Sequence, residues 1–177
     1  MIVVSNTSPL NYLVLIDAEH VLPALYRRVV IPTQVWNELR DAPSKVQQWL
    51  ASAPKWLEVH KAPEHAIPAQ IHVGEAAAIA LAKELHAELL LIDDDDAYRY
   101  AAREGLPVTR TVGVLRDAAT KQLLDLTSAF EKLKRTNFRV SQQLLDDILR
   151  EFTQEQARQA KLTPQSPHKQ ERGLEHE

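Results

Sequence analysis

Residues 74–105, with the sequence GEAAAIALAKELHAELLLIDDDDAYRYAAREG, decide the fold. Residues 74–86 are rich in strong helix formers, and the apolar run Leu89–Ile92 has the length of a buried strand. Four aspartates follow, and then Ala97–Glu104 forms a second helical pattern that stops before Gly105. A helix, a strand and a helix in close succession predict an α/β fold with a parallel sheet.

The same alternation continues on both sides of this stretch. Ser8 is expected to cap the first helix, with Pro9 as its first residue. Further strands are expected at residues 2–4, 29–31, 56–60 and 107–108, and further helices at 9–16, 18–26, 33–40, 44–53, 112–121, 123–134 and 141–158. Strands that alternate with helices predict a central, mostly parallel sheet that is covered on both faces.

Composition narrows the class of protein. The 177 residues are 45% hydrophobic and include no cysteine, which excludes disulfides, thiolate metal sites and cysteine nucleophiles. No apolar run is long enough to span a bilayer and no secretion signal is visible, so we expect a soluble, cytoplasmic protein without membrane contact. The net charge of −3 predicts that any contact with nucleic acid uses a local patch.

Polar side chains follow two of the predicted strands. In parallel α/β sheets, functional groups gather at the carboxyl ends of strands, and this rule selects Asn6 and the run Asp93–Asp96. Asp95 and Asp96 fit the ordinary role of acids at a helix N-terminus, whereas Asp93 and Asp94 lie nearest the strand end and are the better functional candidates. Asn6 can equally be a turn or cap residue.

Two glutamates extend this set of oxygens. Glu75 shares a helix face with apolar residues and points inward, although it also suits the helix dipole. Glu38 lies beside Val35 and Leu39, where a buried carboxylate needs a partner, although a pair with a neighbouring cation is an equal alternative. Hard cations such as Mg²⁺ and Mn²⁺ prefer oxygen ligands. A pair of such cations can activate a water molecule for attack on a phosphodiester.

Four segments in this order resemble PIN-domain proteins. The sequence is similar to the VapC-type toxin ribonucleases and to a PIN-related prokaryotic subgroup. The likeness covers about residues 2–120 and is carried by VVSNTSPLNYL (3–13), VVIPTQVWNEL (29–39), VGEAAAIALAKEL (73–85) and LLLIDDDDAYRYAAREGLPVTRTVGVL (89–115). The resemblance implies a three-layer α/β/α sandwich with a helical C-terminal extension, and an acidic pocket that holds Mg²⁺ or Mn²⁺.

The resemblance also implies roles for individual residues. The catalytic residues would be Glu38, Glu75 and Asp94. The expected metal ligands are these three acids together with Asn6 and Asp93. The family usually has an aspartate where this chain has Asn6, so a neutral amide would replace one charged ligand. The subgroup also tends to have an acid where this chain has His72, which is expected to be a loop residue near the site.

Two more side chains are expected to contact the substrate. Thr7 comes directly after Asn6, and Arg99 lies one helical turn beyond the aspartates. Arg99 can hold a phosphate, but an ion pair with the acidic run is an equal alternative. The three tryptophans lie in apolar patterns and are expected in the core rather than as platforms for nucleobases.

The resemblance implies an endoribonuclease that hydrolyses RNA phosphodiesters, the toxin of a toxin–antitoxin pair. Its partners would be the RNA substrate, a small antitoxin and a second copy in a homodimer. Two other classes remain open: a PIN-like module that binds RNA or protein without turnover, and a receiver-like phosphoacceptor. We expect one domain over residues 1–150, followed by a helical end and a polar flexible tail over 151–177.

Overall fold

The computed structural model describes residues 1–163. Their strands form a five-stranded sheet in the order β3-β2-β1-β4-β5, and each neighbouring pair is parallel. The strands are β1 (Val3–Ser5), β2 (Val29–Pro32), β3 (Leu57–His60), β4 (Leu89–Leu91) and β5 (Val108–Thr109). The predicted α/β class with a parallel sheet is therefore confirmed.

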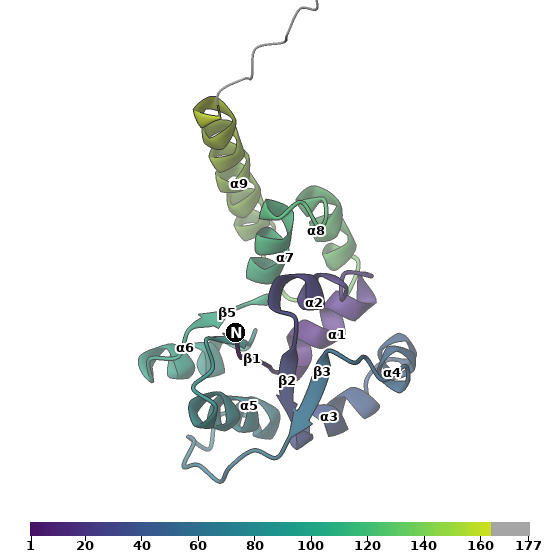
Figure 1. Cartoon of the computed structure of the whole chain (residues 1–177), viewed down its shortest axis with the longest axis vertical. Coiled ribbons are helices and arrows are strands. Elements are labelled where there is room, and N and C mark those ends of the chain that lie inside the picture. Colours follow the sequence, from purple (N-terminus) through teal and green to yellow (C-terminus); the bar gives the residue numbers. More distant parts are fainter. Residues whose placement is uncertain (164–177) are drawn as a thin grey trace, which may run out of the picture. The chain divides into compact units, whose positions relative to one another are not determined.

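Helices connect the strands and cover the sheet (Figure 1). The helices of residues 1–140 are α1 (Thr7–Leu15), α2 (Val21–Tyr26), α3 (Thr33–Arg40), α4 (Ser44–Ala51), α5 (Val73–Glu84), α6 (Asp95–Arg103), α7 (Thr111–Thr120) and α8 (Leu126–Lys134). A further helix, α9 (Gln142–Leu162), follows them in the chain. Most bounds lie within a few residues of the prediction. The start of α1 differs, because Asn6 rather than Ser8 is its N-cap residue.

The sheet is buried on both faces because successive side chains of a strand point to opposite sides. Val4, Val30 and Leu90 face one side, where they share a core cluster with Ile79 of α5 and Ala101 of α6. Helix α5 contacts β1, β2 and β4, and α6 contacts β5. Ser5, Ile31 and Leu91 alternate with these residues and are also fully buried. This two-sided burial is the reason that the strands read as continuous apolar runs.

Helix α9 belongs to a second compact unit. The first unit is Met1–Val140 and the second begins at Ser141, whose hydroxyl accepts a hydrogen bond from the Leu144 amide at 3.2 Å. The domain boundary predicted at residue 150 falls inside α9 and stays a prediction. The polar tail predicted beyond α9 falls mainly on residues 164–177, which lie outside the described part. Over residues 1–163, no helix has both the length and the apolarity to cross a bilayer.

Candidate active site

The strand order places the ends of β1 and β4 side by side at the centre of the sheet. The chain leaves β1 towards β2 on one side, and it leaves β4 towards β5 on the other. Such a switch in strand order opens a crevice at the carboxyl edge of a parallel sheet. Asn6 follows β1 here, and its backbone N–H donates a hydrogen bond to the Leu91 carbonyl at 2.9 Å. Asn6 therefore lies at the carboxyl edge of the sheet, where the sequence predicts it, and its functional role stays a prediction.

Asn6 contacts Glu75 across this edge. The Asn6 side chain is 1% exposed, and its Nδ2 donates to Glu75 Oε1 at 3.1 Å. Glu75 lies in the first turn of α5 and its carboxylate is 19% exposed. An ionised carboxylate only accepts hydrogen bonds, so the amide presents its NH₂ group to Glu75 and leaves its carbonyl oxygen free. The inward orientation of Glu75 predicted from its helix face is confirmed.

Glu38 reaches the same place from α3. Thr7 Oγ1 donates to Glu38 Oε2. The carboxylate lies against the start of α5 at a position that only glycine leaves open, because a Cβ on Gly74 would stand 2.8 Å from Glu38 Cδ. Gly74 thus provides the space that Glu38 occupies.

His72 lies between the two glutamates. Its Nδ1 is 3.4 Å from Glu75 Oε2 and 3.6 Å from Glu38 Oε1. The sequence predicts a loop histidine, and the structure gives it a more specific place as the N-cap residue of α5. Its imidazole is 74% exposed, so this ring forms the solvent side of the cluster.

Three buried oxygens of this cluster accept no hydrogen bond from any residue of the described chain. They are Asn6 Oδ1, Glu38 Oε1 and Glu75 Oε2. Buried oxygens without a donor are costly, by about 1–3 kcal/mol each, and a native structure tolerates them chiefly where water or an ion completes them. Oxygens of this kind are the ligands that Mg²⁺ and Mn²⁺ prefer, so the residues fit a divalent cation.

Acidic and histidine side chains alone do not make up a complete set of ligands for a cation at this edge. Within residues 1–163, no three His, Asp or Glu side chains are placed so that they hold a metal ion by themselves. An ion at this edge would need the Asn6 oxygen and water in addition to the two glutamates. Mg²⁺ usually binds in this way, through one or two carboxylates and several water molecules.

Asp93 joins three loops of the carboxyl edge. Its Oδ2 accepts from Ser8 Oγ and Thr111 Oγ1, both at 2.7 Å, and its Oδ1 accepts from the Thr111 amide at 2.8 Å. The Arg110 guanidinium donates to the Asp93 carbonyl at 2.7 Å. The Ser8 hydroxyl is thus used by Asp93, which explains why it does not cap α1. With three donors in place, Asp93 holds the ends of β1, β4 and β5 together.

Asp94 has a different environment from the other predicted ligands. It is the N-cap residue of α6, and its Oδ1 accepts from the Ala97 amide at 2.9 Å. Asp95 and Asp96 lie in the first turn of α6, at the helix N-terminus where the sequence predicts them. The expected catalytic role of Asp94 stays a prediction.

The two side chains predicted to contact a substrate already form hydrogen bonds within the protein. Thr7 gives its hydroxyl to Glu38, and Arg99 Nε donates to the backbone carbonyl of Asp95 at 3.2 Å. The cation that pairs with the acidic run is Arg110, which lies 2.8 Å from Asp95 Oδ1 and 4.3 Å from the centre of the Tyr98 ring. The roles of Thr7 and Arg99 in binding a substrate remain predictions.

Sequence reasoning missed Ser8, Gly74 and Thr111 as parts of the site. Thr111 lies just after β5, so the rule that selected Asn6 contains a signal for it. The contacts of Ser8 with Asp93 and of Gly74 with Glu38 span 85 and 36 positions of the chain. No local pattern indicates them, because they depend on the order of the strands.

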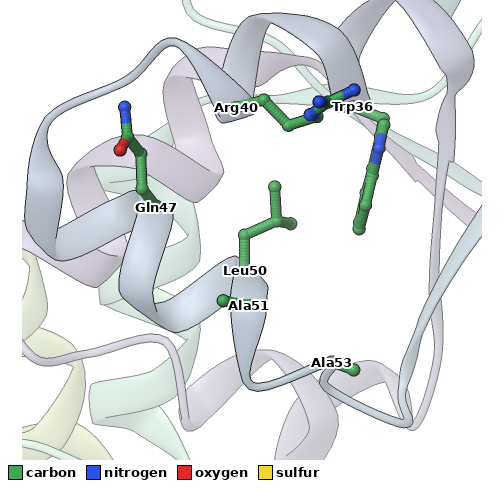
Figure 2. A pocket seen from close by; sticks show the side chains of 6 residues that line it. All are labelled: Trp36, Arg40, Gln47, Leu50, Ala51 and Ala53. Atoms are coloured by element: carbon green, nitrogen blue, oxygen red, sulfur yellow. The ribbon is translucent and has the colours of Figure 1, made fainter.

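A separate hollow lies between α3 and α4 (Figure 2). It is lined by Trp36, Arg40, Gln47, Leu50, Ala51 and Ala53. Trp36 is only partly buried, as are Trp49 and Trp56, so the expectation that the three tryptophans are core residues is wrong. The lining contains no carboxylate and therefore offers no ligands for a hard cation.

The comparisons agree with this arrangement. The model of a family described as a PIN domain (DUF3368) matches residues 2–154. The chain belongs to the PIN-domain family. A PilT N-terminus domain protein from the hyperthermophilic archaeon Sulfolobus solfataricus is similar in structure, with a TM-score of 0.50 and 18% identity over 80% of this chain and 100% of that one. No curated protein matches the sequence.

Membership of the PIN-domain family bears on the site. PIN domains have a nuclease-type fold and typically use divalent metals. The fold similarity and the family match agree on the three-layer arrangement of sheet and helices. Asn6, Glu38 and Glu75 meet at the carboxyl edge of this fold, at the switch in strand order.

Proposed function

We propose that this PIN domain is an endoribonuclease that depends on Mg²⁺ or Mn²⁺, the toxin of a toxin–antitoxin pair. The observation that carries the proposal is the set of three buried, unpartnered oxygens at the switch point of the sheet. Asn6 Oδ1, Glu38 Oε1 and Glu75 Oε2 come from three different elements and meet where a parallel sheet places its ligand.

The acids need a cation before they can act on RNA. Glu38 and Glu75 are two carboxylates beside each other, and a phosphodiester that approaches them carries the same charge. Asn6, Glu38 and Glu75 would hold the ion, and Asp93 and Asp94 are the remaining predicted ligands. A bound divalent ion supplies an acidic water and neutralises charge that develops on the phosphate oxygens.

The residues around the acids position them. Thr7 orients Glu38 through its hydroxyl, and Asn6 orients Glu75 through its amide. Asp93 ties the loops after β1, β4 and β5 to one another, which keeps the ligands at a fixed separation. Arg99 is exposed beside the acidic run, where its guanidinium can meet a phosphate of the RNA.

A second candidate function rests on Asn6. Its neutral amide replaces a charged ligand, so the site has less negative charge with which to hold a cation. The alternative is a PIN-like module that binds RNA or a protein partner without turnover. The toxin role, the small antitoxin, the homodimer and the cytoplasmic location belong to the proposal and follow from the resemblance.

The test is cleavage of single-stranded RNA by the full chain with Mg²⁺ or Mn²⁺. Cleavage should be lost in chelator and in the Glu38→Gln and Glu75→Gln variants. Glu58→Gln is the matched control, because Glu58 lies in β3 and pairs with Arg28 at 2.8 Å. Cleavage that both site variants retain would refute the proposal. Inactive wild type with an active Asn6→Asp variant would favour the binding module.

A further inference from the structure

The hollow between α3 and α4 shares no lining residue with the proposed metal site. Its volume is about 430 Å³, within the range of about 300–1,000 Å³ that is usual for pockets that bind small molecules. In Figure 2 the Trp36 ring and the Gln47 side chain stand on opposite sides of the hollow, and the Leu50 side chain points into it. The space therefore suits a ligand of nucleotide size.

One wall of the hollow is formed by the turn that ends α4. The Ala53 backbone N–H donates to the Leu50 carbonyl at 3.0 Å and closes this turn. On either side of it, the Trp49 and Trp56 rings pack against each other with their centroids 5.8 Å apart. The small side chains of Ala51 and Ala53 leave the hollow open, so a ligand meets a pocket that is already formed.

The lining favours a ligand with an aromatic ring and a negative charge. Trp36 and Arg40 are four positions apart and therefore share one face of α3. Trp36 is only partly buried, which leaves part of its ring open to a ligand that stacks on it. Arg40 is exposed and has no hydrogen bond or ion pair to any residue of the described chain. With no carboxylate in the lining, the Arg40 charge is available to an anion.

Proteins bind single-stranded nucleic acid with the same combination of side chains. Bases of any sequence stack on aromatic side chains, and arginine binds the phosphate. Helix α3 also carries Glu38, two positions from both Trp36 and Arg40, which is about 200° around the helix and about 3 Å along it. The hollow and the metal site thus lie on opposite sides of a helix about 10–12 Å across, which a few nucleotides of RNA can span.

We propose that this hollow binds one nucleotide of single-stranded RNA, with the base against Trp36 and the phosphate on Arg40. The scissile phosphodiester would lie a few nucleotides away, at the metal site. The Gln47 amide can both donate and accept hydrogen bonds at the edge of the base. The inference rests on the proposed function, because it takes RNA as the substrate, and it goes further by adding a subsite away from the acids.

The experiment measures binding of a fluorescently labelled oligoadenylate RNA to the full chain by anisotropy, in chelator so that no metal-dependent cleavage occurs. Trp36→Ala should weaken binding at least about fivefold, and Trp36→Phe, which keeps an aromatic ring, should retain most of the affinity. Arg40→Gln should weaken binding and lower the slope of log Kd against log salt concentration by about 0.7, as for one lost phosphate contact. It changes an exposed side chain and keeps the test decisive if Trp36→Ala fails to fold.

Arg103→Gln is the matched control, because Arg103 is also an exposed arginine in the last turn of a helix. Equal weakening by Arg40→Gln and Arg103→Gln would overturn the inference, because the effect would then be one of net charge. Unchanged RNA binding in Trp36→Ala and Arg40→Gln would overturn it as well. If Trp36→Ala instead lowers the mass of the protein in sedimentation and leaves RNA binding unchanged, the hollow is a protein interface and the inference is wrong.

The outcomes also separate this inference from the proposed function. A wild type that binds no RNA in chelator overturns the inference, because the contacts of Trp36 and Arg40 need no metal. Mn²⁺-dependent cleavage that Glu38→Gln abolishes would still support the proposed function in that case. Conversely, RNA binding that depends on Trp36 and Arg40, in a chain that cleaves no RNA with Mg²⁺ or Mn²⁺, would support this inference and refute the proposed nuclease.

Discussion

Gly74→Ala tests how the site is built, because it changes no ligand. The new Cβ would stand 2.7 Å from Glu38 Oε2 and 2.8 Å from Glu38 Cδ, so the carboxylate must move. Glu38 is 29% exposed and can rotate towards solvent, which relieves the overlap. The movement separates Glu38 from Thr7 and from the free oxygens of Asn6 and Glu75.

The expected effects on stability and on binding are different in size. Alanine gains up to about 1 kcal/mol over glycine within a helix, and the lost charged hydrogen bond costs about 1.5–3 kcal/mol before water replaces it. The net loss in the free energy of unfolding should be about 1 kcal/mol. Loss of one carboxylate ligand should weaken Mn²⁺ binding at least tenfold, which is about 1.4 kcal/mol or more.

The assays are urea denaturation for stability and calorimetry with Mn²⁺ for binding. Gly113→Ala is the matched control, since Gly113 lies in α7 and its Cβ would meet the Thr109 side chain of β5 and no carboxylate. It should leave the Mn²⁺ affinity unchanged. A folded Gly74→Ala protein that binds Mn²⁺ as the wild type does would refute the reasoning that Gly74 makes room for a metal ligand.

Three further predictions concern single side chains. Asn6→Asp should tighten Mn²⁺ binding in calorimetry but lower the metal-free free energy of unfolding by about 1–3 kcal/mol, because an amide donor becomes a like charge; equal stability would contradict this. Thr111→Val removes a donor to Asp93 and should cost about 1–3 kcal/mol in urea denaturation, whereas Thr120→Val, at an exposed hydroxyl, should cost less. Burial raises the pKa of Asp117 above 3.8, so ionisation of this carboxyl opposes folding as pH rises through the folded pKa. Asp117→Asn should therefore increase the free energy of unfolding at neutral pH and leave it unchanged below pH 3.8. An increase that is independent of pH would refute the raised pKa of Asp117.

The sequence predicts much of the fold because its apolar runs and helix signals are local. Strand β4 (Leu89–Leu91) lies within the predicted strand, since burial on both faces requires a continuous apolar run. Helix α3 (Thr33–Arg40) has the predicted bounds. The carboxyl-edge rule also located Asn6. The inward position of Glu75 is predictable because it follows from helix periodicity alone.

The missing part of the site depends on contacts between distant segments. The sequence places Asp93 and Asp94 together, yet the structure gives them separate tasks, with Asp93 bound by Ser8 and Thr111 and Asp94 at the cap of α6. Which carboxylate turns towards the loops depends on the strand order β1-β4-β5, and four consecutive aspartates carry no signal for that choice. The space beside Gly74 is likewise visible only once α3 lies against α5.

The most direct test of the metal site is anomalous diffraction from crystals of the full chain grown with Mn²⁺. We predict one strong peak within about 2.5 Å of oxygens from Asn6, Glu38 and Glu75. A peak bound by other residues, or no peak at this edge of the sheet with saturating Mn²⁺, would contradict the account.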